Sequence, residues 1–257
     1  MKFNIITLGC KVNAYESEFM LENLLRSGYF FDKENPDIII INTCSVTNMA
    51  DRKSRKLVHK ARREHEKAIL VVVGCSTQNH EEDYQNMGID ILLGNREKSK
   101  IVSILEEYIH NHKPYTYFTK ERSLDFEDMQ VEEFTTHTRA FVKVQDGCDN
   151  FCSYCIIPYV RGSIRSKDFN QAIEEVKTLA SHGHKEVVLT GIHTGSYSSN
   201  GHDLSDLIEE MAKIEGLIRI RISSIEITEL NDKFLNLLKK EPKIANHLHI
   251  PLQSGSD

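Results

Sequence analysis

Three cysteines, Cys148, Cys152 and Cys155, lie within one short stretch, and their spacing is the most informative chemistry in this chain. Thiolates at this spacing can hold three irons of a four-iron, four-sulfur cluster. No other cysteine lies nearby in the sequence, so the fourth iron would stay open. An open iron can bind a substrate or cofactor, whereas a fully ligated cluster mostly carries electrons. This spacing therefore predicts an enzyme.

The other three cysteines, Cys10, Cys44 and Cys75, are 34 and 31 residues apart. That separation is about the length of one strand–helix–strand repeat. Each follows an apolar run typical of a strand, over residues 2–8, 38–41 and 69–73. The carboxyl ends of parallel strands lie along one edge of a sheet, where ligands bind. We therefore expect the fold to gather these three thiols into a second metal-binding set.

Two alternatives stay open for this first set. Each cysteine could be a small buried hydrophobic residue, which is a common role of free cysteine. A structural zinc site would need a fourth protein ligand, and no cysteine or histidine stands at the usual short spacing.

The composition is that of an ordinary globular protein, with 257 residues, 40% hydrophobic, 27% charged and a net charge of −6. No apolar run is long enough to span a bilayer, and the N-terminus does not resemble a secretory signal. We expect a cytoplasmic protein, in which metal ligation explains six cysteines better than disulfides do. Nucleic acid would have to bind at a local basic patch.

The pattern of strands and helices predicts an α/β protein with two domains. Residues 1–119 alternate strands (2–8, 38–41, 69–73, 89–93) with helices (16–27, 51–66, 99–110), which implies an open parallel sheet. Residues 120–136 form an acidic linker. Residues 137–257 resume the alternation, with strands at 140–144, 186–189, 218–222 and 247–250 and helices at 171–181, 204–213 and 232–239. Four such repeats predict an incomplete β/α barrel that ends inside a strand-to-helix turn.

Several motifs resemble one known family. Thr7-Leu8-Gly9-Cys10-Lys11-Val12-Asn13, Asn42-Thr43-Cys44 and Gly74-Cys75 resemble the N-terminal domain of the radical S-adenosylmethionine (SAM) methylthiotransferases. The loop Cys148–Cys155, Ile157-Pro158-Tyr159-Val160-Arg161-Gly162 and Leu189-Thr190-Gly191-Ile192 resemble their radical SAM core. Gly-Cys-Lys-Val-Asn and the run 48–55 are similar to the bacterial MtaB-type branch. The family usually completes the barrel and adds a C-terminal TRAM domain, so the resemblance implies a chain truncated at its C-terminus.

The resemblance implies two [4Fe-4S] clusters and SAM as cofactors. The cluster on Cys148, Cys152 and Cys155 would bind and cleave SAM, and the auxiliary cluster on Cys10, Cys44 and Cys75 would present sulfur. The product would be a methylthio group on adenine carbon 2 of threonylcarbamoyladenosine, 3′ to the anticodon of tRNA. An electron donor such as flavodoxin or ferredoxin is implied as a partner.

Further site residues follow from the resemblance. Tyr154, Gly191, Glu226 and Arg161 are expected to contact SAM, with Arg161 suited to its carboxylate or to an RNA phosphate. A core aromatic, a turn glycine and a solvated acid remain the alternatives for the first three. Arg52, Lys53, Arg55 and Lys56 begin a basic helix face expected to bind tRNA, although such runs are usually only solvated.

Other functions fit parts of the same sequence. The substrate could be isopentenyladenosine in tRNA, a ribosomal protein side chain or a small molecule. A non-catalytic iron–sulfur electron carrier and a zinc-stabilised RNA-binding module also remain.

Overall fold

A computed structural model describes residues 1–121, 125–135 and 137–255. The chain divides into two compact units, which are described separately. Unit 1 comprises residues 1–123 and 150–162, and unit 2 comprises residues 124–149 and 163–257. The first division lies inside the expected linker at 120–136. Residues 150–162, which the sequence pattern assigned to the second domain, group with unit 1.

Unit 1 is built on a six-stranded parallel sheet with the order β2-β1-β3-β4-β5-β6. Its central strands are continuous runs of isoleucine, leucine and valine, as expected for strands buried on both faces. The strands are β1 (Lys2–Thr7), β2 (Phe30–Phe31), β3 (Ile38–Thr43), β4 (Ile69–Gly74), β5 (Ile91–Leu93) and β6 (Tyr115–Tyr117). The sequence pattern did not predict β2 and β6, which are short edge strands.

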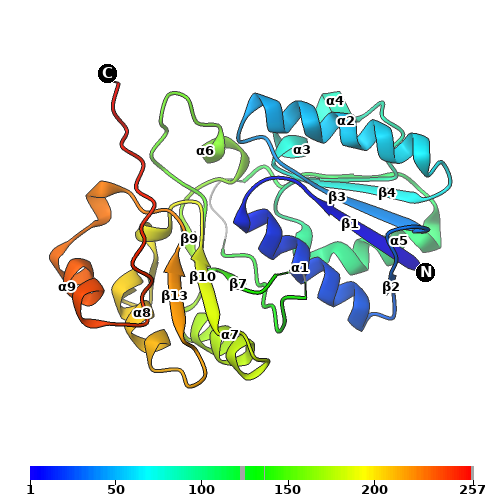
Figure 1. Cartoon of the computed structure of the whole chain (residues 1–257). Helices are drawn as coiled ribbons and strands as arrows, with labels where there is room; N and C mark the ends of the chain where they lie inside the picture. The colour runs from blue at the N-terminus through cyan, green and yellow to red at the C-terminus, as the bar shows by residue number, and fades with distance from the viewer. Residues whose placement is uncertain (122–124, 136, 256–257) are drawn as a thin grey trace. The chain divides into compact units, whose positions relative to one another are not determined.

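Helices cover both faces of this sheet: α1 and α5 lie on one face and α2 on the other (Figure 1). On the α2 face, Val58 and Ala61 pack with Ile39, Ile41 and Val72 in a buried apolar cluster. The helices of unit 1 are α1 (Lys11–Arg26), α2 (Asn48–Glu64), α3 (Cys75–Asn79), α4 (Glu81–Tyr84), α5 (Ile101–Asn111) and α6 (Ile157–Val160), with a 3-10 turn η1 at Lys98–Lys100.

The strand order favours a ligand site at a defined point in unit 1. The chain leaves β1 into α1 on one face, and it leaves the neighbouring β3 into α2 on the opposite face. In open parallel sheets of this order, ligands bind at the carboxyl ends of the strands where the two connections diverge. The fold therefore favours a ligand site beyond β1 and β3.

Unit 2 contains a three-stranded parallel sheet with the order β13-β10-β7. Its strands are β7 (Ala140–Lys143), β10 (Glu186–Thr190) and β13 (Arg219–Ile222), and its helices are α7 (Phe169–Ser181), α8 (Leu204–Ala212) and α9 (Asp232–Lys240). The short elements are β8 (Gln145–Asp146) paired with β9 (Arg165–Ser166), β11 (Ser198–Ser199) paired with β12 (His202–Asp203), and the 3-10 turns η2 (Thr194–Ser196) and η3 (Ile227–Glu229).

The fourth barrel strand expected at 247–250 does not form. His249 in this segment makes an isolated parallel bridge to Ser224, just after β13, and Ile244, which precedes the segment, makes one to Ile220. His247, His249 and Ile250 are exposed, so none of the described elements covers the segment and holds it in a ladder. Pro251 also lacks the N–H that a continuing strand would donate. The described barrel therefore has three regular strands.

The expected linker packs on unit 2 in its described part. Met129, Val131 and Phe134 are buried. The Val131 N–H donates to Glu175 Oε1 at 2.9 Å, and the Phe134 N–H donates to His184 Nε2 at 3.1 Å. Because the composition of 120–136 is acidic, the sequence pattern did not predict that these three apolar residues are buried. Among the described residues, no helix is long and apolar enough to cross a membrane.

Candidate metal centre

The first three cysteines lie at the carboxyl ends of three neighbouring strands in unit 1. Cys10 follows β1 after a short turn, Cys44 directly follows β3, and Cys75 directly follows β4. The strands β1, β3 and β4 are adjacent in the sheet, and Thr43 pairs with Gly74, so two of the cysteines leave the sheet at one level. The fold thus brings Cys10, Cys44 and Cys75 to the same sheet edge. That they bind iron together stays a prediction.

Glycine precedes two of these cysteines for a steric reason. Gly9 has φ +108°, and a Cβ there would lie 2.7 Å from Cys44 Cβ and 2.8 Å from Cys44 Sγ. Gly74 has φ +122°, and a Cβ there would lie 2.5 Å from the Thr43 carbonyl oxygen. Both backbones are in a conformation that favours glycine. The missing side chain of Gly9 is what lets the Cys10 turn lie against Cys44.

Asn13 joins the ends of β1 and β3. Its Nδ2 donates to the Leu8 carbonyl at 2.8 Å and to the Thr43 carbonyl at 2.9 Å. Its Oδ1 accepts from Cys10 Sγ at 3.7 Å. One buried amide therefore fixes the spacing of two strand ends and orients a thiol.

The helix α2 fixes Cys44 in turn. Ser54 Oγ donates to the Cys44 carbonyl at 3.1 Å and accepts from the Cys44 N–H at 3.2 Å. Burial raises the pKa of the Cys44 thiol, and the negative charge of Cys10 raises it further. Burial likewise raises the pKa of Cys75, whereas the positive charges of Arg161 and Lys98 lower it. Buried thiols are therefore kept neutral unless a metal or a cation stabilises the thiolate.

A buried ionic network lies beside these thiols, and sequence reasoning missed most of it. Lys98 Nζ contacts Glu16 Oε2 at 2.6 Å, and Arg161 Nη1 contacts Glu16 Oε1 at 3.0 Å. Arg161 Nη2 also donates to Asn13 Oδ1 at 3.0 Å. All four side chains are almost fully buried. Charged residues in helices are normally expected to face solvent, so the sequence pattern did not indicate that Glu16 is buried. The one hint was that Asn13 and Glu16 lie close to Cys10 in the sequence.

Asn95 continues the network to the third thiol. Its Oδ1 accepts from Lys98 Nζ at 2.6 Å and from Cys75 Sγ at 3.6 Å. Arg161 was expected to contact SAM or RNA. The structure places its guanidinium on Glu16 and Asn13, and the SAM contact stays a prediction.

Among the described residues, no group of three or more His, Cys, Asp or Glu side chains converges as a single metal ion requires. A four-iron cluster binds each thiolate to a different iron, so its ligands need not meet at one point. Three thiols beside two buried cations match a thiolate-bound cluster better than an oxygen-liganded ion, because the Glu16 carboxylate in this network is bound by Lys98 and Arg161. The donor chemistry of this edge therefore fits an iron–sulfur cluster.

The second cysteine set lies on a loop whose residues are divided between the two units. Cys148 belongs to a segment of unit 2, and Cys152 and Cys155 belong to unit 1. All three are half-buried, and the Cys155 N–H donates to the Cys152 carbonyl at 2.9 Å in a tight turn. Phe151, with φ +47°, stacks edge-on to Tyr159 at 5.7 Å. In unit 1 the helix after this loop, α6, packs against α3, whose first residue is Cys75.

Tyr154 is 75% exposed, so it is not a core aromatic. The expectation that it contacts the adenine of SAM is a prediction that its exposure permits.

The strand ends of unit 2 carry the other expected SAM contacts. Gln145 Oε1 accepts from the N–H groups of Ile192 and His193 at 2.9 and 2.7 Å. A Cβ at Gly191 would lie 2.9 Å from that oxygen, so the glycine makes room for Gln145. Glu226 is half-buried and its carboxylate caps the η3 turn. Roles of Gly191 and Glu226 in SAM binding stay predictions.

Sequence reasoning missed a histidine–carboxylate pair at these strand ends. His193 Nε2 lies 2.7 Å from Glu229 Oε1, and this hydrogen bond raises the pKa of His193. Gly195 allows the approach, because a Cβ there would collide with the Glu229 carboxylate.

The basic helix face on α2 divides into two groups. Arg55 forms ion pairs with Asp51 and Asp83, and Arg62 pairs with Asp90, so both arginines serve the fold. Arg52, Lys53 and Lys56 are exposed, and among the described residues they form no ion pair. The exposed three remain available for an anionic partner.

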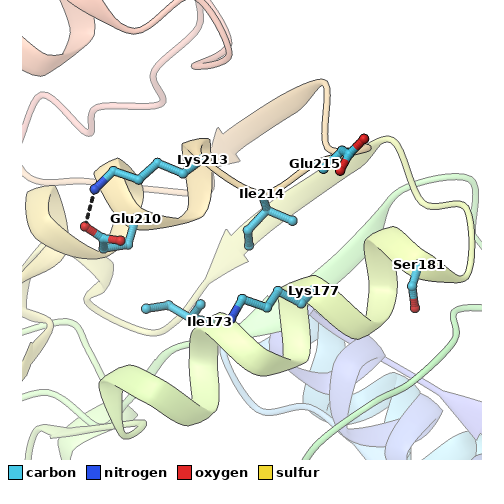
Figure 2. A pocket seen from close by; sticks show the side chains of 7 residues that line it. All are labelled: Ile173, Lys177, Ser181, Glu210, Lys213, Ile214 and Glu215. Carbon is cyan, nitrogen blue, oxygen red and sulfur yellow. Dashed lines mark hydrogen bonds and ion pairs between the residues drawn. The ribbon is translucent and has the colours of Figure 1, made fainter.

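An open cavity in unit 2, of about 430 Å³, lies between α7 and α8 (Figure 2). Ile173, Lys177, Ser181, Glu210, Lys213, Ile214 and Glu215 line it, and Lys213 pairs with Glu210 across its rim. Ser181 and Glu215 precede β10 and β13, so the cavity lies toward the amino ends of these strands. It is therefore separate from the residues that the motifs single out.

Comparison with known families divides the sequence in two. Residues 2–94 match the model of Uncharacterized protein family UPF0004, and residues 142–257 match that of the Radical SAM superfamily. The first match covers Cys10, Cys44 and Cys75, and the second covers Cys148, Cys152 and Cys155.

Several curated proteins are similar over nearly the whole chain. Threonylcarbamoyladenosine tRNA methylthiotransferase MtaB of Bacillus subtilis is 40% identical over 98% of this chain and 57% of its own length. The protein of the same name from Aquifex aeolicus is 39% identical over 100% of this chain and 64% of its own length. The tRNA-2-methylthio-N(6)-dimethylallyladenosine synthase of Thermotoga petrophila is 32% identical over 100% and 59%. The chain thus spans about three-fifths of the length of these relatives.

Solved structures share the fold. The radical S-adenosylmethionine methyltransferase TsrM from Kitasatospora setae, solved with its tryptophan substrate and a SAM analogue, aligns with a TM-score of 0.66 at 13% identity. That alignment covers 98% of this chain and 59% of TsrM. The cobalamin-dependent radical enzyme OxsB aligns with a TM-score of 0.58 at 12% identity, over 99% and 44% of the two chains. At such identities the likeness concerns the fold alone.

Proposed function

We propose that the chain, over the part of its relatives that it spans, is a radical SAM methylthiotransferase, and from this we propose a substrate and a product. The protein adds a methylthio group to adenine carbon 2 of threonylcarbamoyladenosine, 3′ to the anticodon of tRNA. Of the three relatives compared above, the two most similar in sequence are named for that nucleoside.

One structural observation carries the proposal. The sheet of unit 1 brings three thiols from distant parts of the sequence to one edge, at the ends of β1, β3 and β4. The same unit contains Cys152 and Cys155, and α6 after them packs against α3, which begins at Cys75. A second set of thiols, two of which lie in the same unit as the first three, supports a reaction that uses two clusters. An electron carrier needs no such pairing.

The cofactors would be two [4Fe-4S] clusters and SAM. Cys148, Cys152 and Cys155 would hold the cluster that binds SAM, and Cys10, Cys44 and Cys75 would hold the auxiliary cluster. When bound, these groups supply radical hydrogen abstraction and sulfur, which side-chain acids and bases cannot provide at an aromatic C–H bond. The chain's own residues space the thiols, through Gly9 and Asn13, and bury two of them from water.

The partners follow from the same proposal. Arg52, Lys53 and Lys56 on α2 would contact tRNA phosphates, in a protein that otherwise carries a net charge of −6. A flavodoxin or ferredoxin would deliver the electron that SAM cleavage requires. Such tRNA modification would place the protein in the cytoplasm.

Iron analysis tests the cofactors. After anaerobic reconstitution we expect about eight irons per chain, from two four-iron clusters. Replacing Cys10, Cys44 and Cys75 together by alanine should leave about four. A triple variant that keeps all eight would show that the first set is structural. A stoichiometric zinc content in place of iron would favour the RNA-binding module.

A nucleoside assay tests the substrate. The protein, SAM labelled in its methyl group and a reductant are incubated with tRNA that lacks only this methylthio group. Label should appear in 2-methylthio-threonylcarbamoyladenosine. Label in an isopentenyladenosine nucleoside or in a ribosomal protein would assign one of the alternative substrates instead.

A further inference from the structure

Two exposed aromatic rings form a pair in unit 1. Phe151 and Tyr159 are 42% and 69% exposed, and their ring centroids lie 5.7 Å apart at an interplanar angle of 81°. Tyr159 is the one exposed residue of the helix α6, whose other side chains, Ile157, Pro158 and Val160, are buried. The helix is therefore fixed to the protein by its neighbouring residues, while the ring of Tyr159 remains accessible.

Protein stability does not explain this pair. Phe151 has φ +47°, a conformation that is unfavourable for a bulky residue and that asparagine or glycine adopts more easily. The exposed part of each ring adds nothing to stability, because only apolar area removed from water stabilises a fold. A single exposed aromatic residue is ordinary. Residues held in such an uncommon backbone conformation, however, cluster at functional sites.

The aromatic pair lies near the exposed basic residues of α2. The helix α6 packs against α3 (Figure 1), and the first turn of α2 is joined to α3 by the hydrogen bond that Ser76 Oγ donates to Asp51. Arg52 and Lys53 directly follow Asp51, and both are exposed. Because α2 and α3 follow the neighbouring strands β3 and β4, positive charges and aromatic rings meet at one edge of the sheet.

Aromatic rings beside positive charges match single-stranded RNA. Proteins recognise unpaired RNA bases by stacking them on aromatic side chains, while Arg and Lys contact the phosphates. The proposed reaction also needs such a contact. An enzyme that modifies a base takes this base out of its stack, which costs stacking energy. A protein ring that stacks on a neighbouring base offsets part of that cost.

We propose that Phe151 and Tyr159 form a stacking platform for an unpaired base of the anticodon loop, next to the adenosine that is modified. Tyr159 stacks on the base, and Phe151 holds the tyrosine ring in place from the side. The inference depends on the proposed function, since it takes tRNA as the ligand. The rival occupants of the platform are the adenine of SAM and a protein electron donor.

Binding of an anticodon stem-loop RNA tests the platform. The 257-residue chain is reconstituted anaerobically with iron and sulfide, kept free of SAM and titrated into the fluorescently labelled RNA. Tyr159→Ala should weaken binding roughly 5- to 100-fold, as expected when a stacked aromatic side chain is removed. Tyr159→Phe keeps the ring and should bind like the wild type. Phe30→Ala is the matched control, because Phe30 is 68% exposed on the edge strand β2, and it should change the affinity little.

Two further measurements separate stacking from a change in charge or in folding. A ring contact neutralises no phosphate, so Tyr159→Ala should leave the slope of log affinity against log salt unchanged. RNA with an abasic nucleotide on one side of the target adenosine, or on the other, is then tested. Loss of the stacked base should weaken binding to the wild type, and Tyr159→Ala should weaken binding of that RNA no further. This loss of additivity identifies the base.

The outcomes separate this inference from the function on which it rests. Weaker binding with an unchanged salt slope and a non-additive abasic effect support the platform. If Tyr159→Ala binds the RNA like the wild type, or if its effect adds to every abasic effect, the platform is wrong and the proposed substrate stands. A loss of SAM binding, or of reduction by flavodoxin, in that variant would then assign the ring to a rival occupant. If the wild type binds no anticodon stem-loop, the tRNA substrate and the platform both fail.

Discussion

Single residues make the thiol edge possible, and Gly9 shows this most directly. It combines a backbone at φ +108° with contact distances that leave no room for a methyl group beside Cys44. Cys10 carries the thiol, and Gly9 before it lets the turn at Cys10 lie close to Cys44. This pairing was visible in the sequence only as Gly-Cys.

Replacing Gly9 by alanine should therefore cost more than its backbone conformation alone. A positive φ costs a non-glycine residue about 1–2 kcal/mol, and the contact with Cys44 adds to it. Gly28→Ala is the matched control, because Gly28 has φ +83° and a Cβ there would meet no atom within 4 Å. We expect a larger loss of unfolding free energy in urea for Gly9→Ala, together with lost iron. Equal losses in the two variants would show that Cys44 moves aside for the added methyl group without a cost in stability.

The His193–Glu229 pair should make stability depend on pH. The pKa of His193 lies above its ordinary value of 6.5 in the folded protein, chiefly because Glu229 accepts its hydrogen bond. A raised folded pKa contributes stability that is complete below the unfolded pKa and is lost as the pH rises through the folded one. The stability difference between the wild type and Glu229→Gln should thus shrink as the pH rises above 6.5, the ordinary pKa of histidine. Urea unfolding of both proteins measures it, and a constant difference would contradict the pairing.

At the scale of elements, periodicity and apolar runs were enough for the four inner strands of the unit 1 sheet and for the long helices of both units, but not for the edge strands β2 and β6 or the short helices α3, α4 and α6. They could place Cys10, Cys44 and Cys75 beyond strand ends because that position follows from local pattern and sheet topology. They failed where structure depends on distant contacts. The segment 247–250 has strand-like residues but is mostly exposed, whereas Glu16 and Lys98 have the residue types of a surface and are buried by the fold.

The segment 129–134 was also predicted wrongly from local sequence, because a distant contact holds it in place. A buried ion pair on unit 2 binds this part of the acidic segment that was expected to be a linker. Lys167 Nζ binds the Glu175 carboxylate and donates to the Met129 carbonyl at 2.5 Å. Lys167→Met should lower the unfolding free energy by about 3–5 kcal/mol, since it leaves a buried carboxylate without its cation. Lys167→Met/Glu175→Gln, which removes both charges and keeps an acceptor for Val131, should recover much of the loss in chemical denaturation. Additive losses would mean that the charges are not coupled.

For the whole molecule, a net charge of −6 opposes binding to RNA, so the proposed tRNA contact of the exposed basic residues of α2 would have to be local. Arg52→Glu/Lys53→Glu should weaken tRNA binding and reduce the slope of log affinity against log salt by up to about two. Lys239→Glu/Lys240→Glu, at exposed positions on α9, is the matched control for net charge. Filter binding at several salt concentrations compares them. Equal effects of the two pairs would assign the change to overall charge.

Unit 1 is discontinuous in the chain, because residues 150–162 complete it after the first strand of unit 2 has been made. During synthesis, Glu16 therefore gains its ion-pair partner Arg161 late, although the strands of the unit 1 sheet leave the ribosome much earlier. A proteolytic fragment ending near residue 123 would keep the early cysteines but lose this late partner. A cluster inserted on Cys10, Cys44 and Cys75 in the cell would therefore meet the completed ion pair of Glu16 and Arg161 only after the second cysteine loop has been translated.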